Sequence, residues 1–553
     1  MANNFFAKKS VDELIAQTEE SEHKLKRALG SFDLVLLGIG AIIGTGIFVL
    51  TGVGAALHAG PAVTLSFGVS AIACVFAALC YAEFASIIPV SGSAYTYAYA
   101  TIGELLAWII GWDLILEYAV CSITVAIGWS GYLVNLLAGL GIIIPAWMST
   151  PPFNVPALFI VAIITTLLVI GIKESARFNN VIVIAKLTVI LFFIILGLFF
   201  IKPENWKPFM PFGWSGVMTG AAIVFFAYIG FDAVSTTAEE TKNPQRNLPI
   251  GIIVSLLVCS SLYIIVALVL TGIIPVMKYA DNQSFLSAPI AFALNVIGQP
   301  WASGIISVGA VMGITSVLLV MMMGQPRIFF SMSRDRLFPE SISKVHPRFR
   351  TPYKTTIITG VAVGLVALLI PIGTAAELAN IGTLFAFAIV SASVLILRKT
   401  NPGIKRSFRV PIVYVISPLG VMFSLYLMYS LPVLTWIRFL AWLDIGLLIY
   451  YFYSRTHSRI ADRVSRDKAF HWKDMLEFFG IFALINGILF GLLSVLAMIG
   501  VTSVKTWNEI NLQPHKTAVI CLVLIVAGIA VFLTGRVGNR NHGSSAGVTN
   551  PEA

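Results

Sequence analysis

Residues 38–48 read Gly38-Ile-Gly40-Ala-Ile-Ile-Gly44-Thr45-Gly46-Ile47-Phe48, so four glycines fall within nine positions of an apolar run. Glycine destabilises a helix interior because it loses more backbone freedom on folding than other residues do. Two interpretations are open. Gly40 and Gly44 can let a second helix pack closely. Alternatively, the helix unwinds at Gly44–Gly46, and unwound backbone at membrane depth is tolerated only where it is buried in protein or faces a water-filled cavity.

The composition places this run in a membrane protein. Of 553 residues, 58% are apolar and only 11% are charged, and the mean hydropathy is +0.90. A soluble protein needs roughly a quarter of its residues charged, and a disordered chain needs low hydrophobicity with high net charge. Both classes are excluded, and the sequence predicts an all-α polytopic membrane protein.

Fourteen apolar runs are long enough to cross the bilayer, which takes about 20 mostly apolar residues. The third and eighth runs are long and leave room for interfacial turns. The runs lie near residues 31–57, 62–88, 103–140, 156–172, 180–201, 216–238, 250–274, 288–330, 355–371, 376–397, 411–433, 437–453, 475–500 and 517–535.

The distribution of basic residues predicts the orientation. With the N-terminus inside and the runs alternating, the inside segments hold most of the 36 lysines and arginines. The outside segments hold only Lys202, Lys207, Lys278, Arg438, Lys505 and Lys516. This bias follows the positive-inside rule and predicts a multi-pass cell-membrane protein with both termini in the cytoplasm. The net charge of +10 therefore reflects topology rather than a nucleic-acid partner. Short loops and tails are compatible with a bacterial inner membrane.

A second interrupted run favours unwinding at 44–46. The sixth run contains Phe225-Phe-Ala-Tyr-Ile-Gly-Phe-Asp232, which places a glycine and a carboxylate at mid-span, where a charge is expensive. Interrupted helices five spans apart are the signature of a five-plus-five inverted repeat with its binding site between the halves. Glycines that serve helix packing remain the alternative.

The break at Gly44 would offer two kinds of backbone group. The half-helix that follows it exposes free N–H groups and the positive end of its dipole, which suit a carboxylate. The half-helix before it ends in free carbonyls, which suit an ammonium group or a metal cation. A zwitterionic amino acid fits both ends at once.

Five separated motifs carry a family resemblance. They are Gly38–Phe48, Tyr81-Ala-Glu-Phe-Ala-Ser86 with Pro89 and Ser91-Gly-Ser-Ala-Tyr-Thr-Tyr97, Phe225–Asp232, Glu239-Glu-Thr-Lys-Asn-Pro-Gln-Arg-Asn-Leu-Pro249, and Pro326-Arg-Ile-Phe-Phe-Ser-Met-Ser-Arg-Asp335. They resemble motifs of the amino acid–polyamine–organocation superfamily, and within it the cationic amino acid transporter branch. The resemblance covers about residues 25–455 and implies a LeuT-type fold and secondary transport of amino acids.

The resemblance implies roles for residues at both breaks. Backbone N–H groups of Gly44, Thr45 and Gly46 would hold the substrate carboxylate, and Phe226 matches the aromatic that lids the bound substrate. The α-ammonium would donate to carbonyls of Ile42, Ile43, Phe226, Ala227, Tyr228 and Ile229. Lys186 matches a fifth-span lysine of proton-coupled relatives, whose ammonium stands where sodium sits in sodium-coupled ones.

Lys186 is the one cation of the 36 that belongs to neither an inside nor an outside segment, and it lies within span 5. A lysine about 10 Å from the cytoplasmic edge can snorkel to the interface. The alternative is proton coupling, because a buried lysine can lose and regain its proton. We hypothesise that its protonation fastens span 5 to span 1 and controls substrate binding or release.

Several carboxylates have more than one possible role. Glu117 lies one turn after Asp113 on the same face of span 3 and suits a proton relay, a cation-attracting vestibule or helix-to-helix hydrogen bonding. Asp232 can bind backbone N–H groups or face the substrate cavity. Glu83 and Glu104, near cytoplasmic ends of spans 2 and 3, are interpreted as gate or packing residues, with an ordinary interfacial position as the alternative. Asp444 in span 12 is unexplained, or marks an oligomer contact.

Two hydroxyls in span 8 complete the candidate site. Thr315 and Ser316 match a pair that helps bind sodium in sodium-coupled relatives, although Lys186 argues against sodium here. Ser316 can instead line the side-chain pocket and leave room for a long substrate. Simple hydrogen bonding between helices is the third reading.

The chain divides by pattern into five parts. They are a cytoplasmic segment (1–30), a ten-helix inverted-repeat transport core (31–397), helices 11 and 12 (411–453), an additional helix pair (475–535) and a flexible cytoplasmic tail (536–553). The additional pair carries polar Glu477, Asn486, Trp507 and Asn508. Lipid packing or a dimer interface is its expected role, with a direct role in transport as the alternative.

The predicted function is proton-coupled import of L-amino acids by alternating access, with broad or small neutral specificity. A cationic amino acid transporter or exchanger is the runner-up, and a sensor or channel-like protein on this fold is an alternative of another class. An enzyme is not expected, because none of the seven histidines is central in a span and no HExxH or P-loop pattern occurs. No cofactor or metal is expected, and the proton gradient supplies the energy. A homodimer or a small membrane subunit is left open.

Overall fold

The computed structural model describes residues 7–10, 29–90, 92–170, 176–339, 353–459, 472–498, 517 and 519–531. Trp507, Asn508, the tail 536–553 and most of the segment 1–30 lie outside these residues. Within the described ranges every regular element is a helix.

The first half of the chain contains the two expected interruptions, one after α2 and one after α10. Its elements are α2 (Ser31–Ile42), η1 (Gly46–Leu50), α3 (Thr51–Gly54), η2 (Ala55–Ala59), η3 (Gly60–Ala62), α4 (Val63–Ile87), α5 (Ser93–Thr101), α6 (Glu104–Gly139), α7 (Ala146–Ser149), α8 (Val155–Ile170), α9 (Ala176–Leu198), η4 (Pro203–Trp206), α10 (Gly213–Val224), η5 (Phe225–Tyr228) and η6 (Asp232–Glu240).

The second half consists mostly of long helices. Its elements are α11 (Pro244–Ile273), η7 (Val276–Tyr279), α12 (Gln283–Ser287), α13 (Pro289–Val296), α14 (Pro300–Arg334), α15 (Tyr353–Leu369), α16 (Ile372–Thr400), α17 (Val413–Tyr429), α18 (Val433–Ile449), η8 (Tyr450–Ser454), α19 (Arg455–His457) and α21 (Trp472–Met498). A further apolar helix spans Val519–Val531.

The two long predicted runs differ in structure. The third is one continuous helix, α6, whose 36 residues extend about 54 Å, well beyond the ~30 Å hydrocarbon core. The eighth divides into α13 and α14, and the new helix starts at Pro300. Proline favours the first position of a helix because the N–H group that it lacks has no intrahelical partner there.

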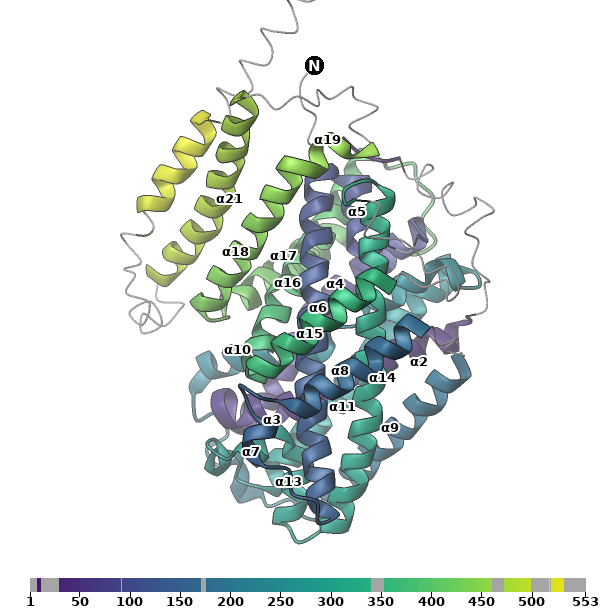
Figure 1. Cartoon of the computed structure of the whole chain (residues 1–553), viewed down its shortest axis with the longest axis vertical. Helices are drawn as coiled ribbons and strands as arrows, with labels where there is room; N and C mark the ends of the chain where they lie inside the picture. Colours follow the sequence, from purple (N-terminus) through teal and green to yellow (C-terminus); the bar gives the residue numbers. More distant parts are fainter. Residues whose placement is uncertain are drawn as a thin grey trace, which may run out of the picture.

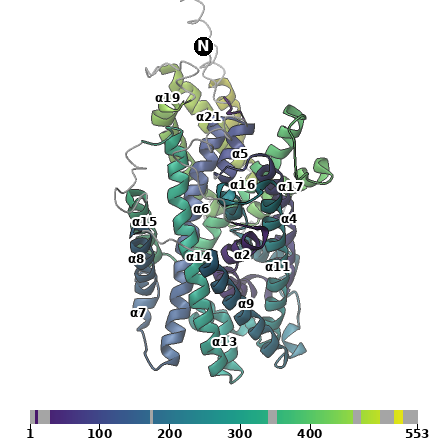
Figure 2. The ribbon, with the colours of Figure 1, turned by 90° about the vertical axis from the view of Figure 1, so that its right-hand side faces the viewer.

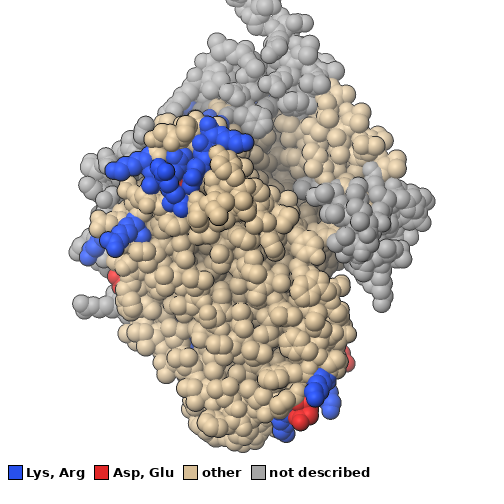
Figure 3. Space-filling model, turned by 180° about the vertical axis from the view of Figure 1, so that it is seen from behind, with Lys and Arg blue, Asp and Glu red and all other residues tan. Residues whose placement is uncertain are grey.

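The apolar surface confirms the predicted class, an all-helical polytopic membrane protein. Among the described residues eight helices are long and apolar enough to cross a membrane, and shorter apolar helices accompany them. Figure 3 shows Lys, Arg, Asp and Glu near the two ends of the visible face, with a wide uncharged belt between them. The predicted count of fourteen spans stays a prediction.

α6 packs extensively against α14 and α16, while α11 packs on α4 and α2 (Figures 1 and 2). α21 lies beside α18 at the edge of the molecule (Figure 1). Asn486 of α21 donates to the carboxylate of Asp444 in α18 at 2.8 Å. Asp444, unexplained from sequence, therefore has a partner that fastens the additional helix to the rest of the chain.

Candidate functional site

The first helix breaks at Ile43 and Gly44. α2 ends at Ile42, Ile43 has an extended backbone (φ −76°, ψ 102°), and helical structure resumes with Thr45 preceding η1. Every residue from 38 to 56 is buried. The last carbonyls of α2 and the first N–H groups of η1 lack intrahelical partners and need other ones.

The second helix breaks at Ile229 and Gly230. α10 continues as the tighter η5, Ile229 is extended (φ −60°, ψ 133°), and η6 begins at Asp232. Gly230 has φ +119°, a backbone conformation that disfavours other residues. A Cβ there would also stand 2.9 Å from the carbonyl oxygen of Ala41 in α2.

The two breaks contact each other directly. A Cβ on Gly46 would lie 2.3 Å from Cα of Ala227, closer than any non-bonded carbon contact, so only glycine permits this approach. Beyond the far ends of these segments, Leu29 before α2 and Thr241 after η6 form an isolated backbone bridge, and the N–H of Lys242 donates to the Leu29 carbonyl at 2.9 Å. The two interrupted segments thus touch at their breaks and again at their far ends.

Lys186 reaches the first break from α9. Its Nζ donates to the carbonyl oxygens of Gly40 at 2.6 Å and Ile43 at 2.8 Å, and its side chain is 1% exposed. These are carbonyls that the end of α2 leaves free. The ammonium therefore holds α9 against the terminus of α2.

Asn380 bonds the helix that leads into the second break. Its side-chain amide in α16 donates to the carbonyl oxygens of Ala222 at 2.7 Å and Ile223 at 3.1 Å, in the last turn of α10. These carbonyls lie where α10 tightens into η5, ahead of the break at Ile229. Nothing in the local sequence around Asn380 indicated this role.

Tyr263 joins the two breaks and was missed from sequence. Its hydroxyl in α11 lies 2.9 Å from the carbonyl oxygen of Ile42 and 2.8 Å from that of Ala227. A hydroxyl has one proton, so it donates to one of these carbonyls at a time. The available signal was a tyrosine within an apolar helix, since a buried tyrosine hydroxyl needs a partner.

The hydroxyl of Thr45 is a buried polar group without a partner. Its Oγ1 has no hydrogen bond within the described chain, although Thr45 is only 1% exposed. Buried polar atoms are normally satisfied, and an exception calls for a missing partner. Gly128 of α6 packs against the Thr45 side chain.

The remaining side chains of the predicted site point in different directions. The Tyr228 hydroxyl donates to the Phe67 carbonyl in α4 at 2.9 Å, so its polar end faces α4. Val317 packs against Gly44, which places this turn of α14 beside the first break. The neighbouring Ser316 hydroxyl donates to Gly313 at 2.7 Å, and Thr315 accepts from the indole of Trp129 at 2.8 Å.

Three buried carboxylates lie close together, those of Asp113, Glu117 and Asp232. Glu117 is near enough to interact electrostatically with each of the other two. Glu117 is near Thr383 of α16, and Asp113 packs on Gly382 of the same helix. Neither oxygen of Asp113 has a hydrogen-bond partner in the part of the chain that the structure describes. The pair on α6 therefore faces α16, and Glu117 also lies near Asp232, just after the second break.

Glu83 and Glu104 contact other helices at the end of the molecule that is predicted to be cytoplasmic. Glu83 accepts two hydrogen bonds from Arg398 at 2.8 and 2.6 Å and one from the Val410 N–H at 2.7 Å, and it pairs with Arg406 at 3.2 Å. Glu104 accepts from the hydroxyls of Tyr99, Tyr450 and Ser458. The predicted gate roles stay predictions, while these contacts tie helices together.

Replacing Glu83 by glutamine is expected to lower the free energy of unfolding by about 2 kcal/mol, because two guanidinium groups lose their carboxylate and one partner is buried. Thermal unfolding in detergent measures the change. The control is Glu204→Gln at an exposed position of η4. An unchanged melting temperature in Glu83→Gln would contradict the ion-pair account.

An N-terminal strap, residues 7–10, crosses the same end of the molecule. Lys9 is 2% exposed and pairs with the carboxylate of Asp335, which also accepts from the Tyr95 hydroxyl at 2.6 Å. The Glu104 N–H donates to the Ala7 carbonyl at 3.1 Å. The strap is thereby fixed to α5, α6 and the end of α14.

A cavity of about 350 Å³, lined by both apolar and polar residues, opens at the opposite end. It extends from Gly128, which packs on Thr45, to His58 and Glu377. The carboxylate of Glu377 accepts from the Thr435 hydroxyl at 2.9 Å. In the predicted orientation this cavity faces outward and leads toward the first break.

Several known proteins have sequences similar to this one. Residues 29–452 match the amino acid permease family. The chain is 54% identical over 469 residues to the branched-chain amino acid permease BcaP of Bacillus subtilis, covering 83% of this chain and 100% of that relative. It is 51% identical over 463 residues to the methylthioribose transporter of the same bacterium, covering 82% and 99%. Cationic amino acid transporter 4, vacuolar, of Arabidopsis thaliana is 37% identical over 412 residues, covering 72% and 68%.

Proposed function

Because the chain belongs to the amino acid permease family, whose members are transporters and not enzymes, we propose that it imports neutral L-amino acids by proton-coupled alternating access. The observation that carries the coupling is the Lys186 ammonium on the Gly40 and Ile43 carbonyls. We further infer a LeuT-type inverted repeat over residues 31–397, with both termini in the cytoplasm of a bacterial cell.

The substrate carboxylate would bind at the start of η1. Its partners would be the N–H groups of Gly44, Thr45 and Gly46 and the unpartnered Thr45 hydroxyl. Helix starts favour anions because their first N–H groups are free and the dipole is positive there. Phe226, 6% exposed at the second break, would cover the bound substrate.

The α-ammonium would bind carbonyls of both breaks. Ile42 and Ala227 now share the single proton of the Tyr263 hydroxyl, so each has capacity for a further donor. A carbonyl oxygen carries two lone pairs, and Tyr263 can bond one carbonyl while the ammonium bonds the other. We expect Tyr263 to complete this site together with Ile43, Tyr228 and Ile229 backbone groups.

Protonated Lys186 would hold α9 and α2 together. Loss of its proton removes the charge from both hydrogen bonds, and charged hydrogen bonds are roughly twice as strong as neutral ones. α9 is then less tightly held to the end of α2, which allows the break to rearrange. Sodium is disfavoured as the coupling ion because the Lys186 ammonium already bonds the carbonyls that a sodium ion would need.

Neutral substrates are favoured over cationic ones by the likeness to a branched-chain amino acid permease, which supports a neutral, apolar side chain. Asp113 and Glu117 face α16, and Asp232, just after the second break, lies against the backbone of Gly230 and Ala233. A cationic amino acid remains the second candidate, supported by the likeness to cationic transporters.

Uptake into proteoliposomes tests the proposal. Labelled leucine, alanine, arginine and methylthioribose would be supplied without sodium, with and without an inside-alkaline gradient. Gradient-driven uptake of leucine or alanine is the expected result. Uptake of arginine alone would select the second candidate, uptake of methylthioribose alone would reject an amino acid substrate, and a requirement for sodium would contradict proton coupling.

The outer cavity yields a separate prediction for Glu377→Gln. Removing one charge weakens the attraction of a cation by about 1 kcal/mol, or roughly fivefold in affinity. Competition by arginine should therefore weaken about fivefold, while leucine, which carries no net charge, should be taken up at an unchanged rate. Thr374→Ala, in the same cavity, is the uncharged control. Equal losses for leucine and arginine would contradict an electrostatic role for Glu377.

A further inference from the structure

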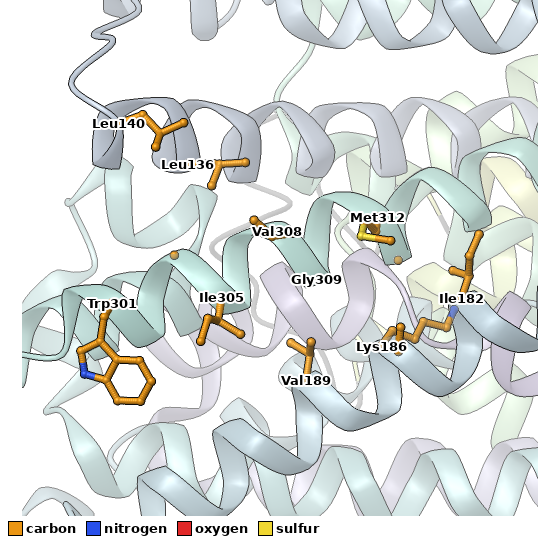
Figure 4. Close-up of a pocket in the computed structure, with 13 residues that line it drawn as sticks. Leu136, Leu140, Ile182, Lys186, Val189, Trp301, Ile305, Val308, Gly309 and Met312 are labelled. Carbon is orange, nitrogen blue, oxygen red and sulfur yellow. The ribbon is translucent and has the colours of Figure 1, made fainter.

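A groove of about 470 Å³ lies on the outer surface of the helix bundle between α9 and α14, beside the end of α6 (Figure 4). Trp301 and Leu140 stand at one end of it, and Lys186 stands at the other. Both α9 and α14 are among the helices apolar enough to cross a membrane. Trp301 is 56% exposed and Leu140 70%, so the groove opens toward the lipid.

The groove exists because glycine leaves its floor open. A Cβ added at Gly304 would meet no atom within 4 Å. Further along α14, a Cβ at Gly309 would stand 2.6 Å from the Val189 side chain, so α9 and α14 are in contact there. The groove is therefore a defined channel along the helices rather than a gap between them.

The inner end of the groove is apolar even though a lysine forms it. Lys186 presents its methylenes, and its Cδ would lie 3.3 Å from a Cβ at Gly313. Its Nζ is directed to the carbonyls of Gly40 and Ile43. The hydrogen bonds of the ammonium are thus made inside the protein, and only the apolar methylenes of Lys186 line the groove.

The outer end has a polar anchor. The Trp301 indole donates to the side-chain oxygen of Gln299 at 2.8 Å. Tryptophan is enriched at the level of the lipid headgroups because its ring is apolar and its N–H is polar. An occupant would therefore be polar at Trp301 and apolar toward Lys186.

The length and polarity of the groove suit a single hydrocarbon chain. From Trp301 to Gly313 α14 rises about 18 Å at 1.5 Å per residue, comparable with half of the ~30 Å hydrocarbon core. The groove holds about 470 Å³ along this length. One acyl chain that runs from the headgroup level toward the bilayer midplane matches its length, its polar outer end and its apolar inner end.

We propose that this groove binds one acyl chain of an outer-leaflet phospholipid, with the headgroup at Trp301 and the chain end against the methylenes of Lys186. The site is separate from the breaks where the amino acid would bind. Its existence does not depend on the proposed transport function.

Photolabelling of the full chain in liposomes tests the site. The probes are two phosphatidylcholines, one with a diazirine at the end of an acyl chain and one with a diazirine near the glycerol. After irradiation, adducts are mapped by mass spectrometry. The end probe should label peptides containing Ala185–Val189 and Met312, and the glycerol probe should label Trp301. The reverse order, or labelling no stronger than on α15, another membrane-facing helix, would overturn the proposal.

Two glycine variants provide the matched comparison. Gly304→Leu fills the groove, and Gly68→Leu adds the same side chain on α4, where a Cβ also meets nothing within 4 Å. Labelling of the groove should fall about tenfold in Gly304→Leu, equivalent to ~1.4 kcal/mol of lost contact, and stay unchanged in Gly68→Leu. Undiminished labelling in well-folded Gly304→Leu, or an adduct between two copies of the chain through α9 or α14, would also overturn it.

Discussion

Lys186→Ala is expected to lower gradient-driven amino acid uptake about 100-fold, equivalent to ~2.7 kcal/mol. The variant loses the ammonium that bonds the carbonyls of Gly40 and Ile43 and fastens α9 to α2. Hydrogen bonds to charged groups contribute about 1.5–3 kcal/mol each, so two of them account for a loss of this size. Initial uptake rates in proteoliposomes with an inside-alkaline gradient measure it.

Lys186→Arg keeps the positive charge but prevents release of the proton. Arginine retains a donor for the two carbonyls but does not release its proton in proteins. We therefore expect a folded protein that binds substrate and fails to accumulate it with the gradient. Full gradient-driven accumulation in either Lys186 variant would contradict the coupling role.

Gly46→Ala is expected to reduce uptake by a similar factor through a different cause. The added Cβ would stand 2.3 Å from Cα and 2.5 Å from Cβ of Ala227, and backbone at that position cannot turn away as a side chain can. The two breaks must then separate, and overpacking of this kind costs about 1–3 kcal/mol. Uptake rate and melting temperature should both fall.

Alanine substitutions at two other glycines are expected to have smaller effects than Gly46→Ala. At Gly44 the nearest atom to an added Cβ is Cγ2 of Val317 at 2.9 Å, and that side chain can shift, so Gly44→Ala should lose less. Gly68→Ala points into open space on α4 and should transport normally. Wild-type uptake by Gly46→Ala would show that the two breaks do not need to touch.

Local sequence was sufficient to find both helix breaks. Glycines at 38–48 and the Gly230–Asp232 pair conflict with a continuous apolar helix, and the structure interrupts both helices there. Composition predicted the all-helical membrane class, and the separated motifs predicted the family and amino acid transport. These four predictions are confirmed by the structure and the family match.

Contacts between residues that are far apart in the sequence could not be predicted from local sequence. Tyr263 bridges Ile42 and Ala227, and Asn380 bonds the end of α10, but neither residue differs locally from an ordinary polar group in an apolar helix. The sequence suggested a gate or packing role, or an ordinary interfacial position, for Glu83, but not its partner Arg398, which lies 315 positions away in the chain. Only the packing of α4 on α16 brings them together.

Proton movement that accompanies substrate entry tests the central claim most directly. Proteoliposomes that contain a pH-sensitive dye, without sodium and without a preformed gradient, would receive unlabelled leucine. The account predicts acidification of the interior with the wild type, no acidification with Lys186→Ala, and retained leucine binding in the variant. Acidification of equal size in Lys186→Ala, or leucine entry into wild-type vesicles with no change in internal pH, would contradict proton coupling through Lys186.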